Sequence, residues 1–237
     1  MAEPETIDHK VEGATIFELK KVGDVLEVWV DGKRRLSSAE RGNADSFVDL
    51  ALAPLRDRDD ITVVLAGLGI GFTLQKLLLH PGVKRVDVVE RSPTVAAWGK
   101  AHFAALTGNA IVDPRVHVHE VGINEFVKAP RQAGMPQEGW LAIVLDTDRG
   151  PTELFYSDNA SLYTDEGLLH IESALRSGGV FATWTNGRDL PLMERMNGPY
   201  QNVAEVCIPV EVGDKMELQY VYRGRRPAQA DPNKPKN

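Results

Sequence analysis

The sequence predicts an α/β fold with a mostly parallel sheet and a nucleoside-binding site at the carboxyl ends of its strands. A β-branched run at 63–66 leads into three alternate glycines within 67–71. A second apolar run at 86–89 ends in Glu90, nineteen residues after the last of these glycines. Glycines allow a ligand to approach the backbone, and an acid at this spacing accepts hydrogen bonds from ribose hydroxyls.

The N-terminal part predicts a small β-structure. Residues 1–12 are polar and are interpreted as a loose leader. The apolar runs 14–19 and 25–30 flank a Gly-Asp turn signal and therefore predict a β-hairpin. A short third strand is expected at 36–38, and a helix at 43–55 with its apolar residues on one face.

From residue 60 onward, strands alternate with helices, which predicts a parallel sheet covered on both faces. The expected strands lie at 61–66, 84–90, 115–120, 141–146 and 180–185. The expected helices lie at 72–80, 93–107, 123–129 and 164–176.

The C-terminal part predicts an antiparallel pair, 203–212 and 215–223, turned at Gly213-Asp214. The polar residues that follow are expected to be disordered. We therefore divide the chain into an N-terminal β-domain with a linker helix (1–55), a nucleoside-binding catalytic domain (56–224) and a tail (225–237).

Composition narrows the classes of partner. The 237 residues carry a formal net charge of −7, which argues against nucleic acid as a partner. No apolar run approaches the roughly 18–20 residues that cross a bilayer, so no membrane partner is expected. The first residues are acidic and polar, unlike a secretory signal, and Cys207 is the single cysteine. A cytoplasmic location without an internal disulfide is the simplest expectation.

The glycine loop reads G-x-G-x-G, with Phe72 where a dinucleotide fingerprint has its last glycine. A bulky side chain there disfavours a pyrophosphate, so a nucleoside without phosphates fits better. Two alternatives stay open: the loop is a structural turn, and Glu90 is a solvated acid at a strand end.

The segment 145–151 contains the strongest candidates for catalytic side chains. Asp146 and Asp148 follow an entirely apolar run, so a buried strand presents two carboxylates at its end. Such acids can hold a cationic amine or take its proton. Asp146 is nearer the strand and is the preferred candidate, whereas Asp148 can instead pair with Arg149 or a neighbouring basic residue. The alternative is a loop whose acids cap a helix.

Other candidates are weaker. His117 and His119 share one face of a strand but have no third ligand at suitable spacing, so no metal site is predicted. Trp98 and Trp184 are expected in the core.

Tyr156 and Tyr163 flank a polar stretch at 157–161. This stretch is interpreted either as a mobile flap over the site or as a plain surface loop.

Together, these residues resemble the spermidine/spermine synthase family, the polyamine aminopropyltransferases, over about 17–224. The resemblance is nearest to short bacterial members with a GLGxGFTL loop and an LDxDxGP loop. Its landmarks are the glycine loop 67–71, Val89-Glu90, Asp113-Pro114-Arg115-Val116, Asp146, Gly150-Pro151, Leu154-Phe155 and Gly178-Gly179-Val180.

The resemblance implies a Rossmann-like class I methyltransferase fold, with a C-terminal antiparallel hairpin and a small N-terminal β-domain. It implies transfer of an aminopropyl group from decarboxylated S-adenosylmethionine to a di- or polyamine. It also implies a homodimer, with the N-terminal hairpin contributing to the contact. Asp146 would be the base that also holds the amine. The implied donor-binding residues are Gly67, Leu68, Gly69, Gly71, Glu90, Arg91, Glu120, Gly122 and Asp146. The implied acceptor-binding residues are Asp148, Tyr156 and Tyr163.

Three departures from the family pattern keep alternatives open. Ile70 stands where the family has an acid for the donor's amine, and Gly122 stands where an acid is expected near the adenine. The Tyr-His-Glu-like triplet before Leu50 is also absent. Intact S-adenosylmethionine is therefore a possible donor for a methyltransferase on this scaffold. A non-catalytic nucleoside-binding relative is a third reading, and a nicotinamide dehydrogenase is a distant fourth.

Overall fold

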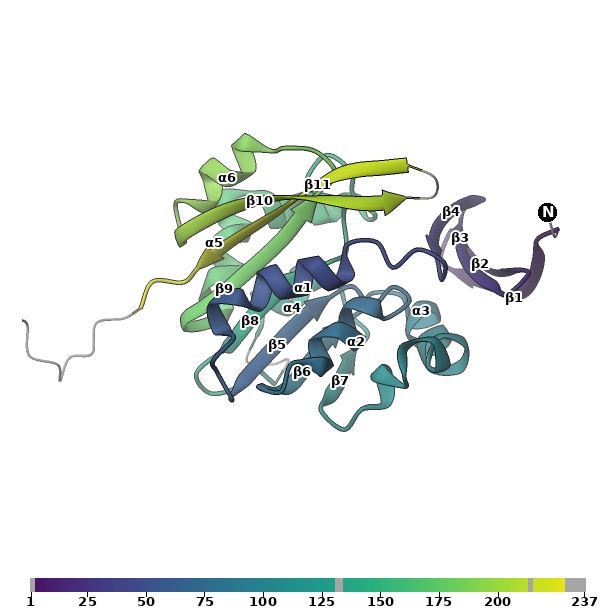
Figure 1. Cartoon of the computed structure of the whole chain (residues 1–237), viewed down its shortest axis with the longest axis horizontal. Coiled ribbons are helices and arrows are strands. Elements are labelled where there is room, and N and C mark those ends of the chain that lie inside the picture. The colour runs from purple at the N-terminus through teal and green to yellow at the C-terminus, as the bar shows by residue number, and fades with distance from the viewer. Residues whose placement is uncertain (1–2, 131–133, 213–214, 229–237) are drawn as a thin grey trace, which may run out of the picture.

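The computed structural model describes residues 3–130, 134–212 and 215–228, and these residues form two β-sheets (Figure 1). The smaller sheet is N-terminal and wholly antiparallel, with strand order β1-β2-β3-β4. Its strands are β1 (Glu5–Glu12), β2 (Thr15–Val22), β3 (Val25–Val30) and β4 (Lys33–Ser37). The predicted hairpin and third strand are therefore present.

The prediction of a loose leader at 1–12 is wrong, because most of it forms the edge strand β1. The Asp8 carboxylate accepts a hydrogen bond from the Trp98 indole at 2.7 Å. The Glu12 carboxylate accepts one from the Ser92 hydroxyl at 2.8 Å. Polar contacts to α3 (Pro93–Trp98) and its N-cap thus hold this strand. A pattern of apolar residues in the sequence cannot predict such contacts.

The larger sheet has seven strands in the order β10-β11-β9-β8-β5-β6-β7. The five strands from β9 to β7 pair in parallel, and the β10–β11 hairpin is antiparallel. This is the predicted class I methyltransferase fold. Its strands are β5 (Ile61–Ala66), β6 (Val83–Val89), β7 (Val116–His119), β8 (Trp140–Leu145), β9 (Leu175–Thr185), β10 (Gln201–Val212) and β11 (Lys215–Arg225).

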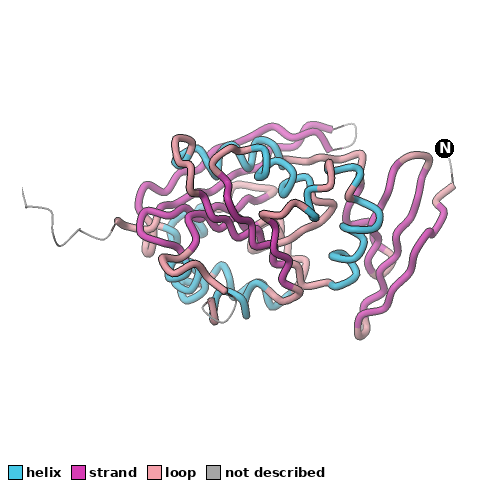
Figure 2. The backbone as a smooth tube through the Cα atoms, turned by 90° about the horizontal axis from the view of Figure 1, so that it is seen from below, coloured by secondary structure: helices cyan, strands magenta, loops and turns pink. Residues whose placement is uncertain are grey.

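Helices cover both faces of this sheet (Figure 2). Alternate side chains of β5 point to opposite faces, so Val63 and Leu65 join one core cluster while Val64 and Ala66 join the other. The first cluster includes α1 (Ala44–Leu52), α2 (Phe72–Leu79) and α3 (Pro93–Trp98). The second includes α4 (Ile123–Lys128), α5 (Asp165–Ala174) and α6 (Leu190–Met196).

Two helical segments differ from the prediction. The expected helix at 93–107 is not continuous: α3 ends at Trp98 and passes into π-helical and 3-10 turns. Gly99 is the first residue of the π-helical turn, and a Cβ there would lie 2.8 Å from the Ile111 side chain. Helix α6 was not predicted from the sequence, although Asp189 caps it by accepting the Leu192 N–H at 2.9 Å.

Other predictions fall partly outside the described residues. The turn at Gly213-Asp214 and residues 229–237 of the predicted tail are not described. The start of that tail is ordered, because β11 runs to Arg225 and Arg226 forms an ion pair with Glu172 at 2.7 Å. Across 3–130, 134–212 and 215–228, none of the helices is both long and apolar enough for a transmembrane span.

Candidate active site

The glycine loop between β5 and α2 adopts a conformation that requires glycine. Gly67, Gly69 and Gly71 all have positive φ angles, of 91°, 54° and 102°. A Cβ on Gly67 would lie 2.6 Å from the backbone oxygen of Asp146. The loop therefore packs directly against the end of β8, which brings the two predicted segments together.

An inner cavity lies at the carboxyl ends of β5, β6 and β8, where the strand-end rule places a ligand. Its apolar wall consists of Val89, Val95, Val121 and Ile123, and this wall suits a flat apolar ring. The other residues that line it are Leu36, Gly67, Gly69, Glu90, Arg91, Gly122, Asp146, Thr147, Phe155, Tyr156 and Asn159.

Glu90 is buried, with 8% of its surface exposed, and lines the inner cavity. Its carboxylate accepts hydrogen bonds from the Leu68 N–H at 3.0 Å and the Ser92 N–H at 2.8 Å. Burial raises the pKa of Glu90, and these N–H donors oppose that rise. A carboxylate has about four lone-pair sites, more than the backbone N–H groups of Leu68, Ser92 and Gly69 occupy, so Glu90 can also accept a hydrogen bond from a ribose hydroxyl.

Asp146 directly follows β8 and lines two cavities. One carboxylate oxygen accepts a hydrogen bond from the Thr73 hydroxyl at 2.6 Å, and the other accepts one from the Trp184 indole at 2.8 Å. Burial raises the pKa of Asp146 to about 6, which makes it a stronger base than an ordinary aspartate.

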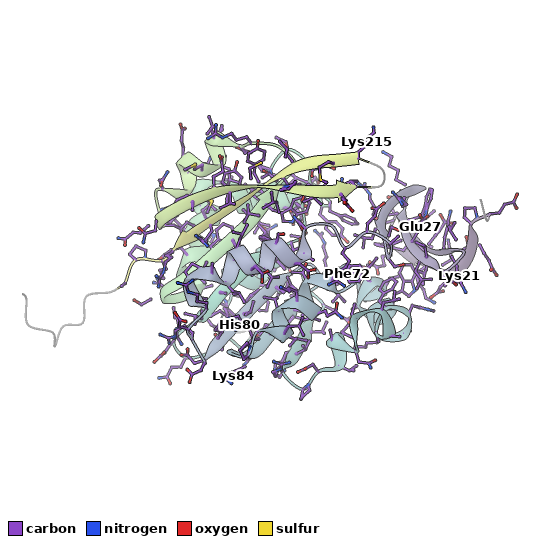
Figure 3. All side chains as sticks on the ribbon, in the orientation of Figure 1. Lys21, Glu27, Phe72, His80, Lys84 and Lys215 are labelled. Carbon is purple, nitrogen blue, oxygen red and sulfur yellow. The ribbon has the colours of Figure 1, made fainter. Side chains whose placement is uncertain are left out.

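The second, outer cavity has a volume of about 440 Å³ and shares Leu36, Gly69, Asp146, Thr147 and Phe155 with the inner one. It lies between the segment from β4 to α1, the glycine loop, the loop after β8 and the β10–β11 hairpin. The end of β10 and the start of β11 lie on the side of the N-terminal sheet (Figure 1). In Figure 3, Phe72, which also lines this cavity, lies at the start of α2 on the side of the N-terminal sheet.

Asp148 is held differently from Asp146. It is 4% exposed, and its carboxylate accepts hydrogen bonds from the Phe155 N–H at 2.7 Å and from the Asn159 amide at 3.0 Å. It does not pair with Arg149, which binds Glu153. Burial raises the pKa of Asp148. Although it lines the outer cavity, its main bonds shape the loop that follows β8.

Tyr156 and Tyr163 occupy different environments. Tyr156 lines the inner cavity, and the Arg91 guanidinium lies 4.5 Å from its ring centre. Arg91 also binds Asp158 at 2.7 Å, and this contact joins the end of β6 to the predicted flap. Tyr163 is buried, with its hydroxyl 3.5 Å from Asp148, and lines neither of these two cavities.

Two more of the predicted donor-binding residues differ in placement. Gly122 lines the inner cavity, whereas the Glu120 side chain is exposed and lines neither cavity. Leu68 lines the outer cavity and contributes its backbone N–H to Glu90.

Two residues that hold the candidate base were not predicted from the sequence. Thr73 lies in the first turn of α2, and Trp184, expected in the core, lies near the end of β9 and donates to Asp146. The strand-end rule that identified Asp146 also applied to Trp184. Trp98 is in the core as expected, with 1% of its surface exposed.

The two alternating histidines do not share a ligand. His119 lies 2.8 Å from Asp87, a buried acid that also accepts the Trp140 indole N–H, while His117 is exposed. Among the described residues, no three His, Cys, Asp or Glu side chains gather in a way that would hold a metal ion.

The site can bring two molecules together. An apolar slot with Glu90 at its edge suits a nucleoside, and the outer cavity can admit a second reactant. Asp146 lies on the wall that both cavities share, where a base can act on that reactant.

Comparison with known proteins adds sequence relatives. Putrescine N-methyltransferase 1 of Nicotiana tabacum is 30% identical over 173 residues, covering 71% of this chain and 41% of that protein. Polyamine aminopropyltransferase 2 of Streptomyces coelicolor is 33% identical over 99 residues, covering 40% of this chain and 17% of that protein. The chain thus spans about two fifths of the length of the putrescine methyltransferases it matches. No protein-family profile matches it.

Comparison with solved structures supports the fold. Spermidine synthase from Thermotoga maritima superposes with a TM-score of 0.69 at 15% identity, over 94% of this chain and 74% of that one. The shared fold therefore extends beyond the segments with recognisable sequence similarity.

Proposed function

Because this chain belongs to the spermidine/spermine synthase family, we propose that it transfers an alkyl group from an adenosyl sulfonium to an amine nitrogen. The observation that carries the proposal is the position of Asp146, on the wall between the cavity that contains Glu90 and the outer cavity. The inner cavity would bind the adenosyl donor, and the amine would enter from the outer one.

The chemistry needs a free amine and a positioned carbon. The amine lone pair attacks a carbon bonded to the positive sulfur. As the new C–N bond forms, the C–S bond breaks and its electron pair stays on sulfur, which becomes a neutral thioether. Asp146 holds the incoming ammonium and takes the proton that the nitrogen must lose. Its raised pKa favours this proton transfer.

The first candidate reaction is aminopropyl transfer from decarboxylated S-adenosylmethionine to a di- or polyamine, with 5′-methylthioadenosine as the second product. The polyamine aminopropyltransferases among the relatives support it. In this proposal Glu90 binds the ribose, and Tyr156 with Arg91 covers the inner cavity.

The second candidate is methyl transfer from intact S-adenosylmethionine. Ile70 favours it: this side chain is 6% exposed and lines the outer cavity at the glycine loop, where the family has an acid for the donor's amine. An apolar residue there removes repulsion against a carboxylate on the donor. The putrescine N-methyltransferases among the relatives are consistent with this reading.

One experiment separates the candidates. The protein is incubated with 1,4-diaminobutane and either donor, and products are identified by mass spectrometry, with Asp146→Asn as the matched inactive control. Spermidine and 5′-methylthioadenosine would establish aminopropyl transfer, whereas N-methylated amine and S-adenosylhomocysteine would establish methyl transfer. Turnover of neither donor over a panel of amines would refute both and favour a non-catalytic relative.

A homodimer is also proposed. Val11 and Ile16 form a cross-strand pair on the outer part of the N-terminal sheet and are 60% and 43% exposed. Such paired apolar side chains favour a contact with a second copy. Sedimentation of the wild type and a Val11→Lys variant tests this, since the charged variant should sediment as a monomer.

A further inference from the structure

Gln219 on β11 is a buried polar residue in the outer cavity whose acceptor has no partner. The residue is 5% exposed and lines the cavity. Its Oε1 makes no hydrogen bond with any described residue. Buried polar atoms are nearly always bonded, so an unpaired one that lines a cavity indicates a ligand group.

The orientation of the Gln219 amide follows from its neighbours. The Asn186 amide nitrogen donates to the Glu153 carboxylate at 2.7 Å, and that carboxylate can only accept. The Asn186 oxygen therefore faces Gln219, whose amide nitrogen donates to it at 3.3 Å. The free atom of Gln219 must then be its carbonyl oxygen, so the missing ligand group must be a hydrogen-bond donor.

Charge around Gln219 favours a cationic donor. Glu217 precedes Gln219 by two residues on the same face of β11 and lines the same cavity, as does Glu211 on β10. Neither glutamate has an ion-pair partner among the described side chains.

The cavity lining also carries cations, but three of them are paired with carboxylates. Arg34 binds Glu40, Arg41 binds Asp45 and Arg149 binds Glu153. Arg35 lies over the Phe155 ring, and Lys33 also lines the cavity. Because Glu211 and Glu217 are not paired with these cations, the part of the cavity that they line favours an ammonium.

Strand pairing places this acceptor on the same side of the sheet as the tryptophan that holds the candidate base. Trp184 donates to Asp146, and Asn186, two residues further along the same chain segment, holds Gln219. Gln219 and Asp146 line the same outer cavity, so one linear diamine inside it can contact both.

We propose that Gln219 determines acceptor specificity: its Oε1 binds the far ammonium of a linear diamine whose near nitrogen lies at Asp146. The placement of the near nitrogen at Asp146 rests on the proposed function. The binding of the far ammonium by Gln219 rests on the row of hydrogen bonds from Glu153 through Asn186 to Gln219.

Calorimetry with two probes tests the proposal: 1,4-diaminobutane, and butylamine, which has the same carbon chain without the second nitrogen. Wild type should bind the diamine at least about tenfold more tightly, since a hydrogen bond to a charged group changes affinity by that order. Gln219→Leu should reduce this ratio to near one by weakening the diamine alone. The exposed Glu217→Gln should lower it by about twofold to fivefold, as expected for a solvent-exposed charge.

Gln201→Leu is the matched control, because Gln201 is exposed on the same hairpin and lines neither cavity. It should leave the ratio unchanged, and melting curves verify that each variant is folded. If Gln219→Leu fails to fold, the binding ratio of Glu217→Gln provides the test. Equal binding of the two probes by wild type, or an unchanged ratio in the folded variants, would overturn the assignment.

The binding ratio is independent of turnover. A protein that consumes neither donor but still prefers the diamine through Gln219 would refute the proposed function and keep this inference. Turnover of a donor, with the same diamine preference in Gln219→Leu as in wild type, would support the proposed function and refute this inference.

Discussion

Thr73 and Asp146, which are 73 residues apart in the sequence, share a hydrogen bond of 2.6 Å at the junction of the two cavities. The bond joins the first turn of α2 to the end of β8. Together with Trp184 on the other oxygen, it fixes the plane of the Asp146 carboxylate while leaving lone pairs available to a substrate. The position of the candidate base is therefore set by side chains from two other elements.

Activity should depend on the ionisation of Asp146. Only the carboxylate can take a proton from the amine, and the pKa of Asp146 is raised to about 6. We expect kcat/KM to fall about tenfold per pH unit below about pH 6 and to level off on this limb above it. Asp146→Asn should lower kcat at least about 100-fold, within the range for a positioned acid or base. The exposed Asp57→Asn serves as control, and an unchanged rate in Asp146→Asn would exclude this role.

Ionisation of Asp146 should lower the stability of the fold as pH rises, although it raises activity. A folded-state pKa above the ordinary value of 3.8 means that the folded protein favours the protonated form. The contribution of Asp146 to the free energy of unfolding is therefore greatest below pH 3.8 and is lost as pH rises through about 6. In urea titrations, the stability of Asp146→Asn relative to wild type should increase between pH 4 and pH 6 and then stay constant. A difference independent of pH would contradict the assigned shift.

Glu90→Gln should weaken both the glycine loop and donor binding. The substitution replaces one accepting oxygen with an amide NH₂, which then faces the N–H of Leu68 or Ser92. We expect a loss of about 1–3 kcal/mol in the free energy of unfolding and a rise of at least about tenfold in the donor Kd. Glu120→Gln is the control, because that side chain is exposed and lines neither cavity. Equal effects of the two variants on donor binding would count against the role of Glu90.

Ile70→Asp should change donor preference. The added carboxylate would accept a charge-assisted hydrogen bond from the donor's amine and repel a donor carboxylate. We expect the affinity for decarboxylated relative to intact S-adenosylmethionine to rise about 10–150-fold, as for a bond to a charged group. Ile70→Asn separates charge from size and should change the ratio much less. An unchanged ratio in the aspartate variant would place the donor's tail elsewhere.

Gly67→Ala should be strongly destabilising. Its φ of 91° disfavours any side chain, and the new Cβ would lie 2.6 Å from the Asp146 backbone oxygen. We expect a loss of at least about 2 kcal/mol, the order of the cost of overpacking and of a strained backbone. Gly187→Ala, where a Cβ would meet nothing within 4 Å, is the control for thermal unfolding. Similar melting temperatures for the two variants would show that the loop can move away.

The sequence by itself determined the layers of the fold and the edge at which the site lies. Val63 to Ala66 are continuously apolar because both faces of a parallel strand are buried, and glycines follow where the backbone must turn. The strand-end rule placed Glu90 and Asp146 at one edge before any contact was known, and it favoured Asp146 over Asp148. These features are local, so periodicity and spacing along the chain are sufficient to predict them.

Only the tertiary structure decided how these side chains are held. Thr73 and Trp184 orient the Asp146 carboxylate, whereas Asn159 binds the Asp148 carboxylate within the loop that follows β8. The strand β1, missed in the sequence, is held by polar contacts to residues about 80 to 90 positions away. The free acceptor of Gln219 likewise exists only because Asn186 is fixed by Glu153. Each of these depends on which distant side chains meet after packing, and no local pattern of apolar and polar residues encodes such pairings.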